Sequence, residues 1–123
     1  VVRTAAGSGT EIRGLETLAG QLEALDGLSP AAQRRLLATT LDEAATLGDE
    51  IDGIIAAWRR GDTAALEDAL LTDLADEPEV YRRVVVERND RFLAQVRRLA
   101  ASGDDVLVVV GTLHLVGDDG LLT

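Results

Sequence analysis

The sequence DVLVVVGTLHLVG, from Asp105 to Gly117, decides the predicted fold. Its first part, residues 106–110, is a run of aliphatic side chains without polar alternation, which is typical of a strand that helices cover on both faces. Gly111 ends this predicted strand, and His114, the only histidine, follows in the next loop. Because open parallel sheets bind ligands at the carboxyl ends of their strands, we expect the functional site in this loop.

Helix signals dominate the rest of the chain. Thr17 is a candidate N-cap for a helix that ends at Asp26-Gly27, and Ser29-Pro30 is a start signal for the next helix. We expect a helix boundary near Gly48 and a further helix capped by Asp62 or Thr63.

Two more elements are predicted near the ends of the chain. EIRGL, residues 11–15, is a second candidate strand, and Asp118 and Asp119 are candidate N-caps for a helix that begins around Gly120. The sequence therefore predicts an α/β fold that is predominantly helical, with helices packed on a small, partial parallel sheet.

A long helix is predicted from about Glu79 to Ala101. Its apolar stripe contains Tyr81, Val85, Phe92, Val96 and Leu99. At the helical spacing of 100° per residue, Arg88 and Asn89 lie on either side of the centre of this stripe and point toward the core. A buried arginine needs a carboxylate partner, for which Glu16 is a candidate. A structural ion pair would explain Arg88 as well as a functional one.

Composition excludes several classes of protein. The length of 123 residues allows one domain at most, and the net charge of −10, with arginine as the only basic residue type, disfavours nucleic acid and anionic lipid as partners. No apolar run approaches the roughly 20 residues of a membrane-spanning helix. The absence of cysteine excludes disulfides and thiolate metal ligands but does not fix the compartment.

Several motifs in this order carry a resemblance to a known family. They are GLET at 14–17 followed by Gln21, ERN at 87–89, and GTLHLVGDDG at 111–120. In this pattern the chain resembles the TraB/PrgY/GumN family, whose animal relatives are the Tiki proteins. The match covers nearly the whole chain and rests on the order and spacing of the motifs, since each motif alone is unspecific.

The resemblance implies a metal-dependent protease. The site proposed for this family consists of two Gly-x-x-His motifs, a glutamate and an Arg-Asn pair, and their counterparts here are Gly111 with His114, Glu16, and Arg88 with Asn89. The sequence holds one Gly-x-x-His motif only. We therefore expect it to be a single partial domain over 1–123, the C-terminal half of the family domain, with a helical section at about 29–102 and a strand-loop site at 105–117.

The chemistry of these residues agrees with that implication. Neutral imidazole and carboxylate are suitable ligands for Mn²⁺, Co²⁺ or Zn²⁺, so His114 and Glu16 are the candidate metal ligands, and Glu16 is alternatively a general base. Arg88 would stabilise an oxyanion or bind a substrate carboxylate, and Asn89 would fix a ligand by hydrogen bond. Arg88, Asn89 and Gly111 are the candidate substrate-binding residues. A catalytic site usually needs three protein ligands, so we expect no tightly bound ion in this chain alone.

Other functions remain open at this stage. A peptidase is one hypothesis, a non-catalytic module that sequesters a peptide or small signal is the second, and an inactive helical interaction domain is the third. Because a small sheet leaves exposed edges, we expect a homo-oligomer or a swapped dimer. The resemblance also implies that the protein is located outside the cytoplasm or at a membrane, since relatives are often exported or anchored.

Overall fold

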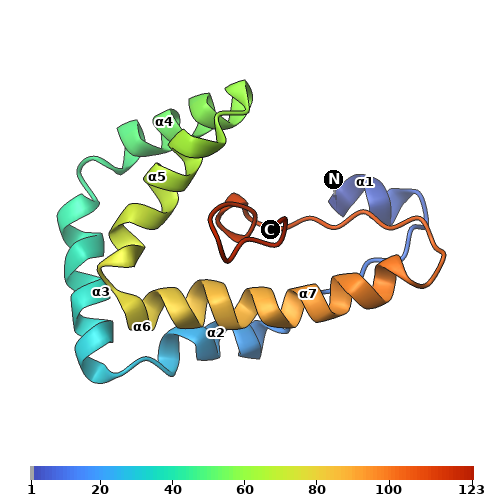
Figure 1. Ribbon diagram of the computed structural model, residues 1–123, viewed down its shortest axis with the longest axis horizontal. Coiled ribbons are helices and arrows are strands. Elements are labelled where there is room, and N and C mark those ends of the chain that lie inside the picture. Colours follow the sequence, from blue (N-terminus) through green and yellow to red (C-terminus); the bar gives the residue numbers. More distant parts are fainter. Residues whose placement is uncertain (1) are drawn as a thin grey trace.

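The computed structural model describes residues 2–123, and its side chains from Arg3 onward. This part of the chain folds into α1 (Val2–Gly7), α2 (Leu18–Asp26), α3 (Pro30–Glu43), α4 (Leu47–Arg60), α5 (Thr63–Ala75), α6 (Pro78–Tyr81), the π-helical segment η1 (Arg82–Val86), α7 (Glu87–Ala100) and the 3₁₀ turn η2 (Thr112–His114). Figure 1 shows that α6, η1 and α7 form one continuous rod with α2 along one side. At one end of the rod α3, α4 and α5 fold back, and the C-terminal residues lie between α5 and the rod.

The predicted α/β fold on a parallel sheet is wrong. No residue between 2 and 123 is in a strand; residues 105–110 run as an extended segment from the end of α7 toward η2 (Figure 1). Leu107 is 77% exposed and Val109 is 61% exposed, so helices do not cover this segment on both faces. The second candidate strand, 11–15, is also irregular. An apolar run indicates a tendency to form a strand, but a strand exists only where a neighbouring backbone supplies its hydrogen bonds.

Side-chain caps start three of the helices where the sequence predicts them. Thr17 accepts a hydrogen bond from the Gly20 N–H at 3.1 Å, Ser29 one from Ala32 at 3.2 Å, and Asp62 one from Ala65 at 3.1 Å. Each cap satisfies a backbone donor of the first helical turn, which has no partner within its helix.

The helix boundary expected near Gly48 is confirmed, since residues 44–46 form a turn and α4 begins at Leu47. Another predicted helix limit needs correction. The helix expected from Gly120 does not form, because the chain makes turns over 118–122. There the Leu121 N–H donates to the carbonyl of His114 at 2.9 Å. This acceptor is seven residues earlier in the chain, so the hydrogen bond closes a loop and is not part of a helical turn.

The main hydrophobic core lies where the link between α2 and α3 meets α6. Leu28, Ala32 and Val80 are buried there, and the partly buried side chains of Leu36, Leu74 and Val84 pack against them. Ser29 reinforces this corner, since its backbone N–H and its hydroxyl both donate to the Glu79 carboxylate at 2.7 Å. These hydrogen bonds from Ser29 hold the pKa of Glu79 below its usual value.

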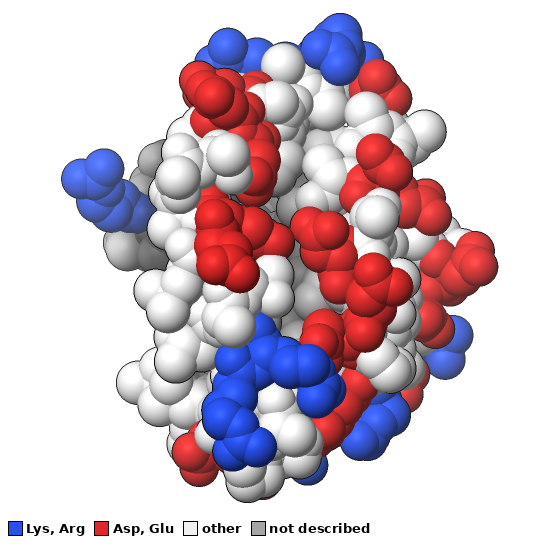
Figure 2. All heavy atoms as spheres, turned by 90° about the vertical axis from the view of Figure 1, so that its left-hand side faces the viewer, with Lys and Arg blue, Asp and Glu red and all other residues white. Residues whose placement is uncertain are grey.

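Much of the remaining apolar surface is exposed. The large hydrophobic side chains of α2, α3 and α4 that face solvent are Leu18, Leu22, Leu25, Leu37, Leu41, Leu47, Ile51, Ile55 and Trp58. Figure 2 views the molecule from the α3 side and shows acidic side chains over much of this face, with a group of arginines near its lower edge. The helices therefore pack through a small core and leave one side of several helices uncovered.

Gly117 allows the C-terminal loop to approach α5. Its φ is +78°, and a Cβ at this position would lie 2.5 Å from Leu71 Cδ1. We predict that Gly117→Ala lowers the free energy of unfolding by about 2 kcal/mol, from left-handed backbone strain together with this contact. Gly61→Ala is the matched control, because Gly61 has φ +67° and a Cβ there would meet no atom within 4 Å, so strain alone acts. Urea denaturation measures both; an equal loss in the two variants would contradict the contact with Leu71.

Candidate functional site

The site is built on one face of α7. Arg88, Asn89 and Phe92 are one and four residues apart along the helix and therefore share a face. Asn89 is 5% exposed and Phe92 is 3% exposed, and the Arg88 side chain retains 13% of its exposure. The Arg88 guanidinium lies over the Phe92 ring, with Cζ 5.5 Å from the ring centroid. Two strongly polar side chains are thus held in a largely apolar setting, as helical periodicity predicts.

Arg88 is paired with Glu16, the partner that the sequence indicates. Its Nη2 donates to Glu16 Oε1 at 2.5 Å and its Nε donates to Oε2 at 3.2 Å, while Nη1 donates to the carbonyl of Val84 in η1 at 3.3 Å. Glu16 lies in a bend before α2. Gln95 on α7 holds that bend, because its Nε2 donates to the carbonyl of Leu15 at 2.5 Å. The bidentate pair thus joins the start of the chain to α7.

Asn89 determines the tautomer of His114. Its Nδ2 donates to the carbonyl of Asp119 at 2.6 Å and to the carbonyl of His114 at 3.4 Å. The other amide atom, Oδ1, is 2.7 Å from His114 Nδ1 and is the acceptor, because an amide oxygen cannot donate. His114 Nδ1 therefore carries the proton, and Nε2 presents a lone pair.

The environment keeps the imidazole neutral. Burial lowers the pKa of His114 from 6.5, the positive charge of Arg88 lowers it further, and Glu16 acts in the opposite direction. Phe92 packs against the imidazole edge to face, with ring centroids 5.3 Å apart and an interplanar angle of 72°. His114 Nε2 has no hydrogen-bond partner but is not among the fully buried side-chain atoms, since Arg83 Nε is the one such atom from residues 3–123 that lacks a partner. Nε2 therefore retains contact with solvent.

Tyr81 and Asp119 fasten the loop that carries His114. The Tyr81 hydroxyl donates to Asp119 Oδ2 at 2.8 Å. Tyr81 lies on the same rod as Asn89, about two helical turns before it. Burial, followed by this hydrogen bond and the nearby acidic charges, raises the pKa of Tyr81 to about 12. Sequence reasoning misses this pair, since Tyr81 fits the apolar stripe and Asp119 fits an N-cap. The available signal is a single tyrosine whose hydroxyl needs a partner when it is buried.

Gly111 shapes the loop. The His114 N–H donates to the Gly111 carbonyl at 3.0 Å, which closes the 3₁₀ turn η2. The structure therefore gives Gly111 a role in positioning His114, and the substrate-binding role expected for it stays a prediction.

The model of the TraB/PrgY/gumN family matches residues 1–123. The chain belongs to the TraB/PrgY/gumN family. The resemblance expected from the motifs is therefore confirmed over the whole chain. Searches of the curated proteins and of the solved structures found no significant match. None of the described helices is both long enough and apolar enough to cross a membrane.

The two candidate metal ligands, His114 and Glu16, meet only part of what a metal site requires. His114 fits as a ligand, because its Nε2 lone pair is free of hydrogen bonds. Glu16 shares its carboxylate with Arg88, which offsets the negative charge available to a cation. Within the described residues, no cluster of three or more His, Cys, Asp or Glu side chains could hold an ion. His114 and Glu16 alone would therefore be too few ligands for a catalytic ion.

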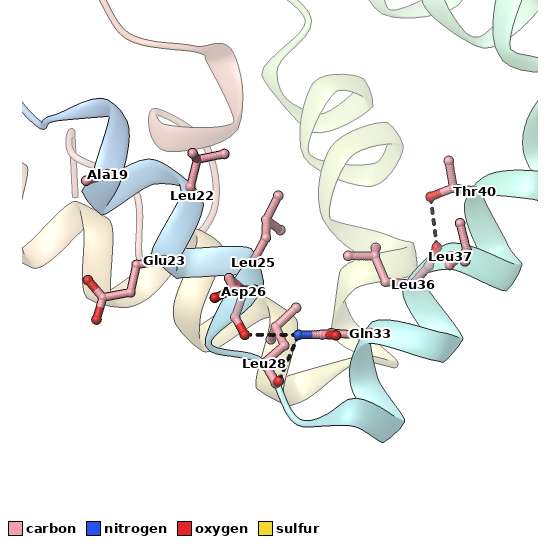
Figure 3. Close-up of a pocket in the computed structure, with 10 residues that line it drawn as sticks. All are labelled: Ala19, Leu22, Glu23, Leu25, Asp26, Leu28, Gln33, Leu36, Leu37 and Thr40. Carbon is pink, nitrogen blue, oxygen red and sulfur yellow. Dashed lines mark hydrogen bonds between the residues drawn. The ribbon is translucent and has the colours of Figure 1, made fainter.

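Two hollows of the surface can be compared with the site. One, of about 760 Å³, lies between α2 and α3 and is lined by leucines such as Leu22, Leu25 and Leu36 (Figure 3). It touches none of the four candidate site residues. A smaller hollow of about 230 Å³ is lined by Asn89 and Asp119, together with residues such as Leu93. The site is therefore next to the smaller hollow.

The neutral imidazole predicts a pH dependence of stability. Because burial and Arg88 lower the pKa of His114 in the folded state, the unfolded chain binds this proton first as the pH falls below 6.5. We expect the free energy of unfolding to decrease from about pH 7 downward, before most carboxylates titrate. Urea denaturation across this range measures the decrease. His114→Gln should flatten it, and an unchanged slope in that variant would show that His114 is not its source.

Proposed function

We propose that this chain forms part of the active site of a metal-dependent hydrolase that cleaves peptides. The observation that carries the proposal is the neutral imidazole of His114, whose free Nε2 lies within the electrostatic influence of the Arg88–Glu16 pair. Membership of the TraB/PrgY/gumN family supports it. The four residues in contact with one another here are those for which the motif resemblance implies a role.

His114 and Glu16 would contribute to holding a divalent ion such as Mn²⁺, Co²⁺ or Zn²⁺. When bound, such an ion polarises a carbonyl or lowers the pKa of a water molecule. Further ligands would have to come from polypeptide other than the described residues, because two side chains do not complete a catalytic site. Asn89 positions the imidazole by holding Nδ1 in its protonated state, so it acts through His114.

Glu16 and Arg88 also have chemistry of their own. Each Glu16 oxygen accepts one hydrogen bond from Arg88, and a carboxylate oxygen has a second lone pair, so Glu16 can still accept a proton from water. The Arg88 guanidinium is suited to bind the oxygen that becomes negative when a carbonyl is attacked. A substrate carboxylate would compete with Glu16 for the same bidentate geometry.

The proposal is tested by cleavage of unstructured peptides with the natural protein that carries this chain, in Mn²⁺ or Co²⁺ and after chelation. We expect metal-dependent cleavage, and we expect His114→Ala and Glu16→Gln each to reduce the rate by about 100-fold or more, the effect typical of losing one acid, base or electrostatic group. Arg59→Ala, in the last turn of α4, is the matched control and should retain the rate.

Circular dichroism must show that each variant keeps its helices. Cleavage that survives His114→Ala would overturn the assignment of that residue. Saturable peptide binding without turnover, in the presence of either metal, would overturn the hydrolase and support a binding module instead.

A further inference from the structure

Gln95 holds the backbone next to Glu16 from the same helix that carries Arg88. Its Nε2 donates to the carbonyl of Leu15 at 2.5 Å, and Leu15 directly precedes Glu16. Gln95 lies seven residues after Arg88, and seven residues of an α-helix complete two turns to within about 20°. The two side chains therefore share a face of α7 and bind adjacent residues of one segment.

The segment that carries Glu16 is attached to the fold by these two side chains. Residues 11–16 are irregular, and within the described part of the chain hydrogen bonds join them to another element at two points, the Leu15 carbonyl and the Glu16 carboxylate. The donors, Gln95 and Arg88, both belong to α7. A carboxylate on an irregular segment is held in one position only where its backbone is also held.

The residues on either side of Glu16 limit its position further. Thr17 caps α2 by accepting from the Gly20 N–H at 3.1 Å, so the chain after Glu16 is tied to the start of a helix. Before it, Gly14 allows a close approach, because a Cβ there would lie 2.9 Å from the carbonyl oxygen of Glu16. Glu16 thus lies in a tight bend, and the Leu15 carbonyl is the point at which the backbone of this bend is bound to α7.

We propose that Gln95 is a positioning residue of the site, which acts through Glu16 by fixing the backbone of the bend that carries this carboxylate. Arg88 attracts the carboxylate, but its two hydrogen bonds to Glu16, at 2.5 and 3.2 Å, require a defined position of the Glu16 backbone. The Gln95 amide supplies that position without a charge, so Arg88 remains the cation that pairs with Glu16. The effect on this pair is independent of the function proposed above, whereas the kinetic consequence rests on it.

A second glutamine makes the same kind of contact away from the site. Gln33 Nε2 donates to the carbonyls of Asp26 and Leu28 at 2.9 and 3.2 Å, at the end of α2 and in the link that follows it (Figure 3). Both glutamines therefore attach irregular backbone to a helix through a side-chain amide. Gln33→Met removes a contact of the same chemistry and is the matched control for Gln95→Met.

Solvent exchange of the Arg88 Nε–H tests the effect on the pair. This group donates to Glu16 Oε2, and its resonance can be assigned by its loss in Arg88→Lys. We expect its proton to exchange about tenfold faster in Gln95→Met than in the native protein, because the carboxylate no longer has a fixed position. Gln33→Met should leave this exchange unchanged.

The variants are chosen so that they keep the helices. Methionine resembles glutamine in length and in helix propensity, so both methionine variants should retain the native circular dichroism. Gln95→Ala removes the side chain beyond Cβ with a residue that also favours helices, and it should accelerate the exchange of the Arg88 proton to the same extent.

Peptide cleavage by the natural protein that carries this chain tests the consequence for the site. We expect Gln95→Met to lower kcat by about 10-fold or more, the effect typical of losing a residue that orients a functional side chain. In the Glu16→Gln background, Gln95→Met should cause no further loss, since Gln95 acts through the carboxylate. Gln33→Met should retain the native kcat.

Three results would overturn the inference. The first is an unchanged exchange of the Arg88 proton in Gln95→Met, and the second is an equal acceleration in Gln33→Met, which would indicate a general loosening of the fold. The third is a loss of kcat that adds to that of Glu16→Gln, because Gln95 would then act by another route. A natural protein that cleaves no peptide would instead overturn the proposed hydrolase, and the exchange of the Arg88 proton would still decide the role of Gln95.

Discussion

The carboxamide of Asn89 is the interaction on which the site depends. It donates to the carbonyls of Asp119 and His114 and accepts from the His114 imidazole, so one buried side chain holds the backbone and the ring of the same loop. Each partner fixes the direction of the next: the two carbonyls orient the amide nitrogen, and the amide oxygen then orients the imidazole. A buried amide with this many partners tolerates no rotation without leaving polar groups unpaired.

The other contacts of the site can be understood as support for this arrangement. Tyr81 holds Asp119 from an earlier turn of the rod, and Gly117 lets the loop pass close to α5. On the other side of the α7 face, Gln95 holds the backbone before Glu16, which places the carboxylate against Arg88. The site therefore depends on a rigid helix and on two irregular segments that are fastened to it. A sheet is not needed to bring these residues together.

Sequence patterns predicted the helices and the inward polar residues because both depend on local geometry. The caps at Thr17, Ser29 and Asp62 require only a side chain and the backbone three residues later. Helical periodicity placed Arg88 and Asn89 on the buried face, and the need to neutralise a buried arginine indicated Glu16.

The predictions that failed depended on contacts between distant parts of the chain. Residues 106–110 have the composition of a strand, but a strand also needs a partner backbone, which no pattern within the segment reveals. The helix expected at Gly120 was prevented by a hydrogen bond from Leu121 to His114, and the contact of Tyr81 with Asp119 spans two elements. Side-chain identity alone does not show which tertiary partner a polar group will take.

The central claim is that burial and Arg88 keep His114 neutral and that Asn89 fixes its tautomer, with the proton on Nδ1 and a lone pair on Nε2. Proton–nitrogen correlation spectra of the imidazole, recorded near neutral pH, measure this directly, and the single histidine makes the assignment unambiguous. The account predicts the Nδ1–H tautomer in the native chain and a shift away from it in Asn89→Leu. A native spectrum showing a proton on Nε2, or a charged imidazolium, would contradict it.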